Sequence, residues 1–120
     1  MSRRTRLVAM ATAVALVCLP AAARADVDGN ELRRLCTSKG ARENGLCYGY
    51  VTAIAEVARG DDGLYGHHAC LPEHTTRRHA VGVVKRFLDQ HPEQRHYGAS
   101  SLVAEALAEA FPCKQQPRAL

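Results

Sequence analysis

Four histidines and one cysteine lie close together in the middle of the chain, and together they offer the donor atoms of a metal site. They are His67, His68, Cys70, His74 and His79. Zinc needs three or four such donors converging on one point. Adjacent histidines in a glycine-rich loop rarely point the same way, and a structural disulfide is the better use of the cysteine. The sequence therefore predicts no metal site and no cofactor.

Nucleophilic catalysis would need a free cysteine or serine beside a base and an orienting group. Ser100 and Ser101 form a tight serine pair, but they stand at the start of a predicted helix, where capping explains them. The sequence contains no nucleophile-elbow motif, no glycine-rich phosphate loop and no Cys-x-x-Cys-His haem motif. These observations predict that the protein is not an enzyme, with no catalytic residues.

The first 25 residues have the order of a secretory signal peptide. Arginines precede an apolar run over 7–19, and Ala23 and Ala25 supply small residues at the expected cleavage site. The apolar run is too short to span a bilayer comfortably, and no second one follows. We therefore expect residues 1–25 to be cleaved and the mature chain to be exported without inserting into a membrane.

The net charge depends on this cleavage. The chain has 16 Lys and Arg against 12 Asp and Glu, and four of the arginines lie in residues 1–25, which leaves 12 against 12. A near-neutral domain with scattered charges shows no electrostatic footprint for nucleic acid or anionic lipid. We therefore expect no nucleic-acid partner.

Hydrophobic spacing predicts four helices, and no segment alternates for long enough to predict a strand. The helices are expected at residues 29–38, 45–59, 75–91 and 98–111. Asp28 is expected to cap the first helix and Asn44 the second. Gly49 and Ala53, small and four residues apart, would let another helix approach the second one closely. The predicted fold class is all-α, a small four- to five-helix bundle stapled by disulfides.

The mature chain predicts one domain over 26–113, followed by a flexible polar tail over 114–120. Four cysteines remain in it: Cys36, Cys47, Cys70 and Cys113. An even number of cysteines in a small exported domain favours two disulfides. Three pairings are possible, and we favour the nested one, Cys36 with Cys113 and Cys47 with Cys70, because it would staple antiparallel helices.

Residues 60–73 form the longest irregular segment and offer a candidate binding surface. Its 60–69 part carries the acidic pair Asp61 and Asp62 and the flexible Gly63 and Gly66, and Leu64 and Tyr65 are expected at its exposed tip. An aromatic side chain in such a loop can anchor in the cleft of a partner. The alternative, that Tyr65 folds back on the core, has equal weight.

The turn over residues 91–97 is a second candidate, with an ordinary structural explanation. Glu93 would suit a helix N-terminus, and Arg95 would satisfy the carbonyl groups that end the third helix. We therefore interpret this turn mainly as a pinned corner.

Four segments together resemble the Rap/Tai family of immunity proteins, which protect bacteria from amidase effectors of type VI secretion. They are "GNELRRLC" (29–36), "CYGYVTAIAEVA" (47–58), "CLPEHTTRRHAVGVVKRFLDQHPEQRH" (70–96) and "SLVAEALAEAFPC" (101–113). The segments come in the order of the family and cover nearly the whole mature chain.

This resemblance implies a periplasmic all-helical protein, often a homodimer, that occludes the active site of a cysteine–histidine peptidoglycan amidase. It implies contacts from a helix and a protruding loop, matched here by the exposed face of the third helix and residues 60–69. The partner-binding residues expected on this basis are Asp61, Asp62, Leu64, Tyr65, His67, His68, Arg78 and Lys85. An alternative function is a small periplasmic chaperone or acid-stress protein, because histidines change charge between about pH 5 and 7.

Overall fold

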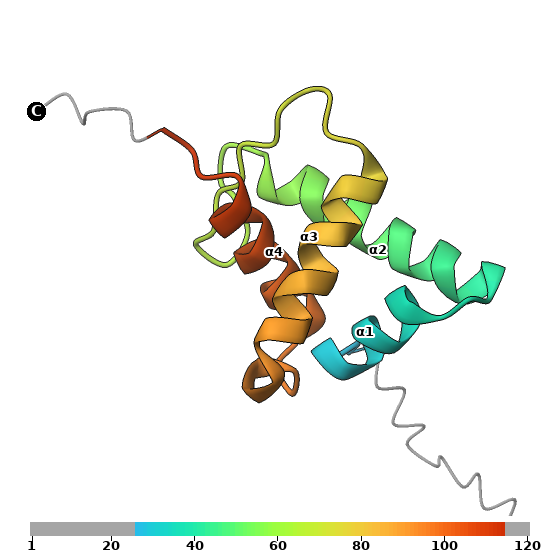
Figure 1. Ribbon diagram of the computed structural model, residues 1–120. Coiled ribbons are helices and arrows are strands. Elements are labelled where there is room, and N and C mark those ends of the chain that lie inside the picture. The colour runs from blue at the N-terminus through green and yellow to red at the C-terminus, as the bar shows by residue number, and fades with distance from the viewer. Residues whose placement is uncertain (1–25, 115–120) are drawn as a thin grey trace, which may run out of the picture.

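The computed structural model describes residues 26–114, which form four α-helices and one short 3-10 helix (Figure 1). The helices are α1 (Gly29–Thr37), α2 (Ala41–Ala58), α3 (Arg77–Gln90), η1 (Pro92–Gln94) and α4 (Ala99–Ala110). No strand longer than an isolated bridge occurs in this part of the chain. The predicted all-α bundle is therefore confirmed. The expected signal peptide and residues 115–120 of the expected tail lie outside the described residues.

The four helices share one apolar core. Its largest fully buried side chains are Leu32, Leu88, Leu102, Leu107, Val51, Val84, Val103 and Cys47. They come from all four helices and recur at helical spacing, as one buried face on each helix requires. Between residues 26 and 114, no polar side chain is buried in this core, and no helix is long and apolar enough to cross a membrane.

Side-chain caps begin two of the helices. At α1, the Asp28 carboxylate accepts a hydrogen bond from the Glu31 backbone N–H at 2.8 Å, which confirms the predicted cap. The Glu31 side chain pairs with Arg34 at 2.6 Å instead of returning to the cap residue. At α3, the Thr76 hydroxyl accepts a hydrogen bond from the His79 backbone N–H at 3.1 Å.

The helix α2 begins earlier than predicted, so the prediction that Asn44 caps it was wrong. Its N-cap is Gly40, and the Asn44 side chain lies within the first turn of the helix. From there its amide group donates hydrogen bonds backwards, to the Ser38 carbonyl at 2.6 Å and the Gly40 carbonyl at 3.2 Å. The side chain thus braces the short connection from α1 rather than starting the helix.

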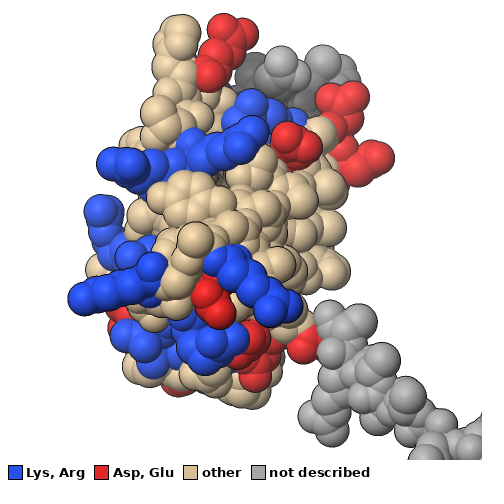
Figure 2. All heavy atoms as spheres, turned by 90° about the vertical axis from the view of Figure 1, so that its right-hand side faces the viewer, with Lys and Arg blue, Asp and Glu red and all other residues tan. Residues whose placement is uncertain are grey.

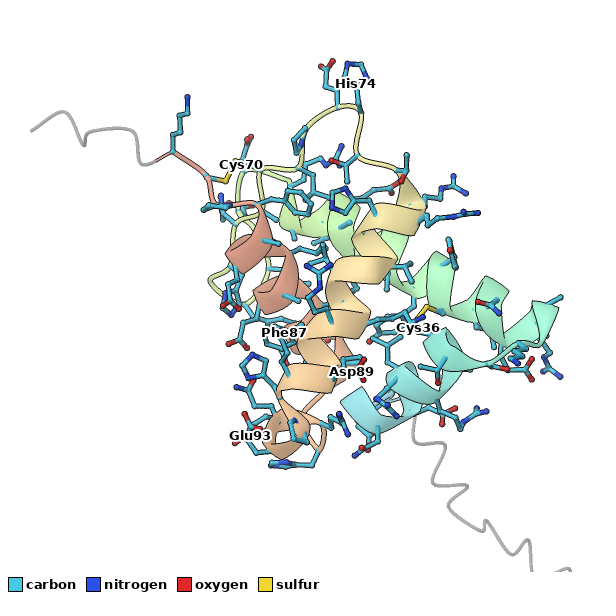
Figure 3. The ribbon with its side chains drawn as sticks, viewed as in Figure 1. Cys36, Cys70, His74, Phe87, Asp89 and Glu93 are labelled. Atoms are coloured by element: carbon cyan, nitrogen blue, oxygen red, sulfur yellow. A yellow bond between two sulfur atoms is a disulfide. The ribbon has the colours of Figure 1, made fainter. Side chains whose placement is uncertain are left out.

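Both disulfides form, but the nested pairing was wrong. Cys36 bonds to Cys47 with a Cα–Cα distance of 5.0 Å, and Cys70 bonds to Cys113 at 4.9 Å. The first bond joins α1 to α2, which follow each other directly in the chain. The second joins the segment before α3 to the chain just after α4, where the Cys70 backbone N–H also donates to the Phe111 carbonyl at 2.9 Å. Figure 3 shows the two bonds well separated in the molecule.

Candidate partner-binding surface

Residues 60–69 fold into a tight hairpin between α2 and α3. Leu64 and His67 exchange two backbone hydrogen bonds, each 2.9 Å long. Between them, Tyr65 and Gly66 have φ angles of 52° and 78°. Two positive φ angles at the centre of a two-residue loop are typical of a type I′ turn, the usual connection of a tight hairpin. The segment predicted as an irregular loop is therefore a defined structure.

The base of this hairpin is held by the bundle. The Ala69 backbone N–H donates to the Ala58 carbonyl at the end of α2, at 3.1 Å. Within the hairpin, a Cβ atom on Gly63, whose φ is 62°, would collide with the ring of His68. Glycine is therefore required at position 63, both for the backbone conformation and for the close contact.

Tyr65 has the most unusual conformation in the hairpin. Among the described residues it alone has a positive φ angle without being glycine. This left-handed region is unfavourable for a bulky side chain, and such residues persist only where the surrounding structure imposes them. The side chain is also 64% exposed. A strained, exposed aromatic residue at the tip of a hairpin is a candidate contact for a partner.

The ring of Tyr65 lies over the beginning of α4. Its hydroxyl is 3.1 Å from the hydroxyl of Ser100. A depression of about 310 Å³ lies beside this contact, and Tyr50 and Ser101 also line it. Partial burial raises the pKa of the Tyr50 phenol. Tyr65 thus combines the two alternatives considered from the sequence, because its hydroxyl returns to the bundle while its ring stays exposed.

The serine pair has a different role from the one predicted. The N-cap of α4 is Gly98, and no side chain caps this helix. Ser101 donates its hydroxyl hydrogen to the Gly98 carbonyl at 2.8 Å. Ser100 instead faces Tyr65, so the prediction that capping explains this pair was wrong. A tyrosine 35 residues away in sequence gives no local signal for such a contact.

The expected partner-binding residues fall into two groups. The first belongs to the hairpin and comprises Asp61, Asp62, Leu64, Tyr65, His67 and His68. The second comprises Arg78 and Lys85 on α3, where Arg78 is exposed and Lys85 half-buried. In Figure 1, α3 and α4 run in opposite directions side by side. Arg78 in the first turn of α3 therefore lies at the other end of the bundle from the contact between Tyr65 and α4.

The histidines do not gather into a metal site. Over residues 26–114, no three His, Cys, Asp or Glu side chains converge closely enough to hold an ion. Cys70 is consumed by its disulfide, and His79 packs edge-on against Phe111 with ring centroids 5.6 Å apart.

The turn over residues 91–97 is fixed by its own hydrogen bonds, as predicted. The Arg95 side chain donates from Nε to the Leu88 carbonyl at 2.6 Å, near the end of α3. The carboxylate of Glu93 accepts a hydrogen bond from its own backbone N–H, which lowers the pKa of that carboxyl, and His91 lies 3.3 Å away. Glu93 and Asp89 mark this lower end of the bundle in Figure 3.

The charged side chains are unevenly distributed over the surface. Figure 2 shows the side of the molecule on the right of Figure 1, where Lys and Arg gather in two groups with uncharged surface between them. By contrast, residues 60–66 of the hairpin include two acidic residues and no Lys or Arg. The hairpin and this basic side therefore present different chemistry to a partner.

The comparisons with known proteins agree with the architecture. A family model described as Rap1a immunity proteins matches residues 28–113. No curated protein matches the chain. The matched region contains all four α-helices, the hairpin and both disulfides. The resemblance noted from the sequence is thereby confirmed, and the chain belongs to the family of Rap1a immunity proteins.

Proposed function

We propose that this immunity protein acts in the periplasm, where it binds a type VI peptidoglycan amidase and blocks its active site. Family membership supports an immunity protein directed against a type VI effector. The more specific parts of the proposal are the amidase, the periplasm, a homodimeric assembly and the hairpin as the inhibitory contact. The family match favours this function over a chaperone or acid-stress role.

The observation that carries the proposal is the fixed and exposed ring of Tyr65. Its backbone is held by the turn, and its hydroxyl by Ser100 at 3.1 Å. A side chain that is already ordered loses little conformational entropy when a partner binds it. Tyrosine also offers a large contact area with few rotatable bonds. Such a residue on a hairpin can enter a concave cleft without rearrangement of the bundle.

The hairpin carries negative charge close to its tip. Asp61 and Asp62 are both exposed, and they lie before the turn that carries Tyr65. These carboxylates would complement cationic groups at the mouth of a target cleft, which raises mainly the association rate.

The two disulfides support action outside the cytoplasm. Disulfides form and persist in oxidising compartments, including the bacterial periplasm. Peptidoglycan, the substrate of the proposed target, also lies in that compartment. The pattern of residues 1–25 supplies the expected route of export.

Co-expression tests this function directly. A candidate type VI peptidoglycan amidase is directed to the periplasm with the wild-type protein, with Tyr65→Ala or with Tyr97→Ala. Tyr97 is a matched control, since it is 54% exposed and lies outside the hairpin. We expect the wild type and the control to prevent lysis and to co-purify with the amidase, and Tyr65→Ala to do neither.

Two results would contradict the proposal. Lysis in the presence of correctly exported wild-type protein, without co-purification, would exclude that amidase as the target. Full protection by Tyr65→Ala would exclude the hairpin tip as the inhibitory contact.

A further inference from the structure

A groove of about 450 Å³ lies between α1 and the first half of α2. These two helices pack against each other and are joined by the bond between Cys36 and Cys47 (Figure 1). The volume falls within the range of about 300–1,000 Å³ that is typical of ligand-binding sites. The apolar part of its lining consists of Val27, Leu35, Leu46 and Tyr50.

The side chain that α2 exposes in this groove is Leu46. It is 53% exposed, whereas Leu35 on the facing helix is only 7% exposed. Single exposed apolar residues are common on protein surfaces. Leu46 differs from them because it adjoins three other apolar side chains in one hollow. Another molecule that covered this hollow would remove apolar surface from water, which is favourable.

Charged residues complete the lining, two of each sign. They are Glu31, Arg34, Arg42 and Glu43. Arg34 is held in place by Glu31, which accepts hydrogen bonds from Nε at 2.8 Å and from Nη2 at 2.6 Å. A partner side chain of either charge would therefore meet a like charge, whereas an uncharged apolar side chain would match the apolar part of the lining. An apolar centre with a polar rim is typical of protein interfaces.

The spacing of α2 explains how one helix supplies both the rim and the floor. Arg42, Leu46 and Tyr50 are four residues apart, so they lie one above the other on the same side of the helix. The charge therefore stands at one end of the groove and the aromatic ring at the other, with Leu46 between them.

At its aromatic end, the groove continues into the depression beside Tyr65. Val27 and Tyr50 line both hollows. Tyr65 and Ser100 line the second one. A partner that covers the ring of Tyr65 can therefore reach the groove across Tyr50 without leaving the surface.

From this continuity we infer that the groove is a second contact for the effector and takes one large apolar side chain of it, such as leucine, methionine or phenylalanine. That side chain would come from a segment beside the cleft that Tyr65 enters, so the inference rests on the proposed function. Leu46 and the bound side chain would then exclude water at the centre of a charged rim. Interface residues in such surroundings contribute most of the binding energy.

The first test needs no effector. The mature, oxidised protein is labelled with nitrogen-15 and titrated with N-acetyl-leucinamide, followed by NMR. We expect the leucine derivative to shift the amide resonances of Val27, Leu46 and Tyr50. The derivatives of glycine, lysine and aspartate should shift them much less, and Leu46→Ala should reduce the shifts that the leucine derivative causes.

The second test uses a candidate amidase whose catalytic cysteine is replaced by alanine, with affinity measured by calorimetry. Leu46→Ala should weaken binding about tenfold. Val57→Ala is the matched control, because Val57 also lies on α2 and is 51% exposed, but lines neither hollow. The control should change the affinity by less than about twofold. Circular dichroism and sedimentation of both variants should equal those of the wild type.

The two tests separate this inference from the proposed function. A wild type that binds no candidate amidase would contradict the proposed function, and the NMR titration would still decide for or against the groove. The inference would be overturned if the leucine derivative shifted the groove residues no more than the glycine derivative does. An amidase that binds Leu46→Ala as tightly as the wild type, or loses equal affinity for Val57→Ala, would also overturn it.

Two further results would assign the groove to a different occupant and so overturn the inference. Larger shifts from the lysine or aspartate derivative would identify a charged ligand. A change of oligomeric state in Leu46→Ala would place Leu46 in a contact between copies of the chain.

Discussion

The hydroxyl of Tyr65 lies 3.1 Å from the hydroxyl of Ser100, although the two residues are 35 positions apart in the chain. The contact connects the tip of the hairpin to the first turn of α4. The opposite end of the hairpin is held at α2 through the Ala69 backbone. The projecting tyrosine is therefore attached to the bundle at two places, which limits how far the hairpin can bend when it meets a partner.

Replacing Tyr65 by glycine should weaken binding to the amidase while leaving the stability of the fold nearly unchanged. Glycine adopts a φ of 52° without the penalty that a side chain incurs there, about 1–2 kcal/mol. The loss of the hydroxyl contact with Ser100 offsets part of this gain, by about 0.5–1.5 kcal/mol. We expect the free energy of unfolding to change by less than about 1 kcal/mol while binding to the amidase falls sharply. Urea denaturation measures the free energy of unfolding, and isothermal titration calorimetry measures the affinity for the amidase. A large loss of stability would show that Tyr65 is a structural residue.

The two disulfides should differ in their susceptibility to reduction. Cys36 and Cys47 are only 4% and 0% exposed, whereas Cys70 is exposed. A thiol reductant must reach the sulfur that it attacks, so the bond between Cys70 and Cys113 should open first. Alkylation of the native protein at increasing reductant concentration, followed by peptide mass spectrometry, identifies the order. Simultaneous labelling of all four cysteines would contradict it.

Removal of each disulfide should destabilise the protein by a different amount. The residues of the first bond are 11 apart in sequence and those of the second 43 apart. The chain-entropy model gives a loss of about 3 kcal/mol for the shorter loop and about 4 kcal/mol for the longer one. Chemical denaturation of Cys36→Ser/Cys47→Ser and Cys70→Ser/Cys113→Ser compares them. A larger loss from the shorter loop would show that local strain or packing outweighs loop entropy.

Substitution of two glycines by alanine should have opposite effects. A Cβ atom on Gly29 would lie 2.6 Å from the Leu102 side chain and 2.9 Å from the Arg95 backbone. Gly29→Ala should therefore destabilise the fold by about 1–3 kcal/mol. The Cβ position of Gly82 is open, so Gly82→Ala should stabilise α3 by up to about 1 kcal/mol. Thermal unfolding of the two variants tests the pair, and equal shifts of the same sign would contradict the packing described for Gly29.

The ion pair between Glu31 and Arg34 should contribute to stability only above acidic pH. The hydrogen bond from Arg34 lowers the pKa of the Glu31 carboxyl below its ordinary value of 4.5. A lowered pKa in the folded state means that the stabilisation is present above pH 4.5 and lost as pH falls through the folded-state pKa. Glu31→Gln should therefore be less stable than the wild type at pH 7, and the difference should shrink as pH falls below 4.5, with Glu109→Gln as an exposed control. A difference that does not change with pH would refute the electrostatic explanation.

Local patterns in the sequence predicted most of the fold. Apolar residues at helical spacing placed all four helices, and Asp28 marked the start of α1 because its side chain acts on the nearest free N–H groups. The prediction that Asn44 caps α2 was wrong because its side chain donates to carbonyl groups that precede it in the chain, rather than accepting from N–H groups that follow it. A polar residue near a helix start permits both arrangements, and the local sequence does not distinguish them.

Features that depend on distance in space were not accessible from the sequence. The pairing of Cys36 with Cys47 follows from how α1 turns back onto α2, which spacing along the chain does not reveal. The conformation of Tyr65 was also missed, because type I′ turns usually carry asparagine or glycine at that position. Its contact with Ser100 joins two segments that only the packed bundle brings together.

The attachment of the hairpin has a consequence for how such a protein can change its target. The backbone bond from Ala69 to Ala58 and the bond between Cys70 and Cys113 hold the base without using the side chains at the tip. Residues at the tip can therefore be exchanged while the supporting framework stays the same. Under the proposed function, substitutions at Asp61, Asp62 and Tyr65 would alter recognition of a new toxin while Gly63 is retained, and grafting these positions between relatives would give immunity proteins of chosen specificity.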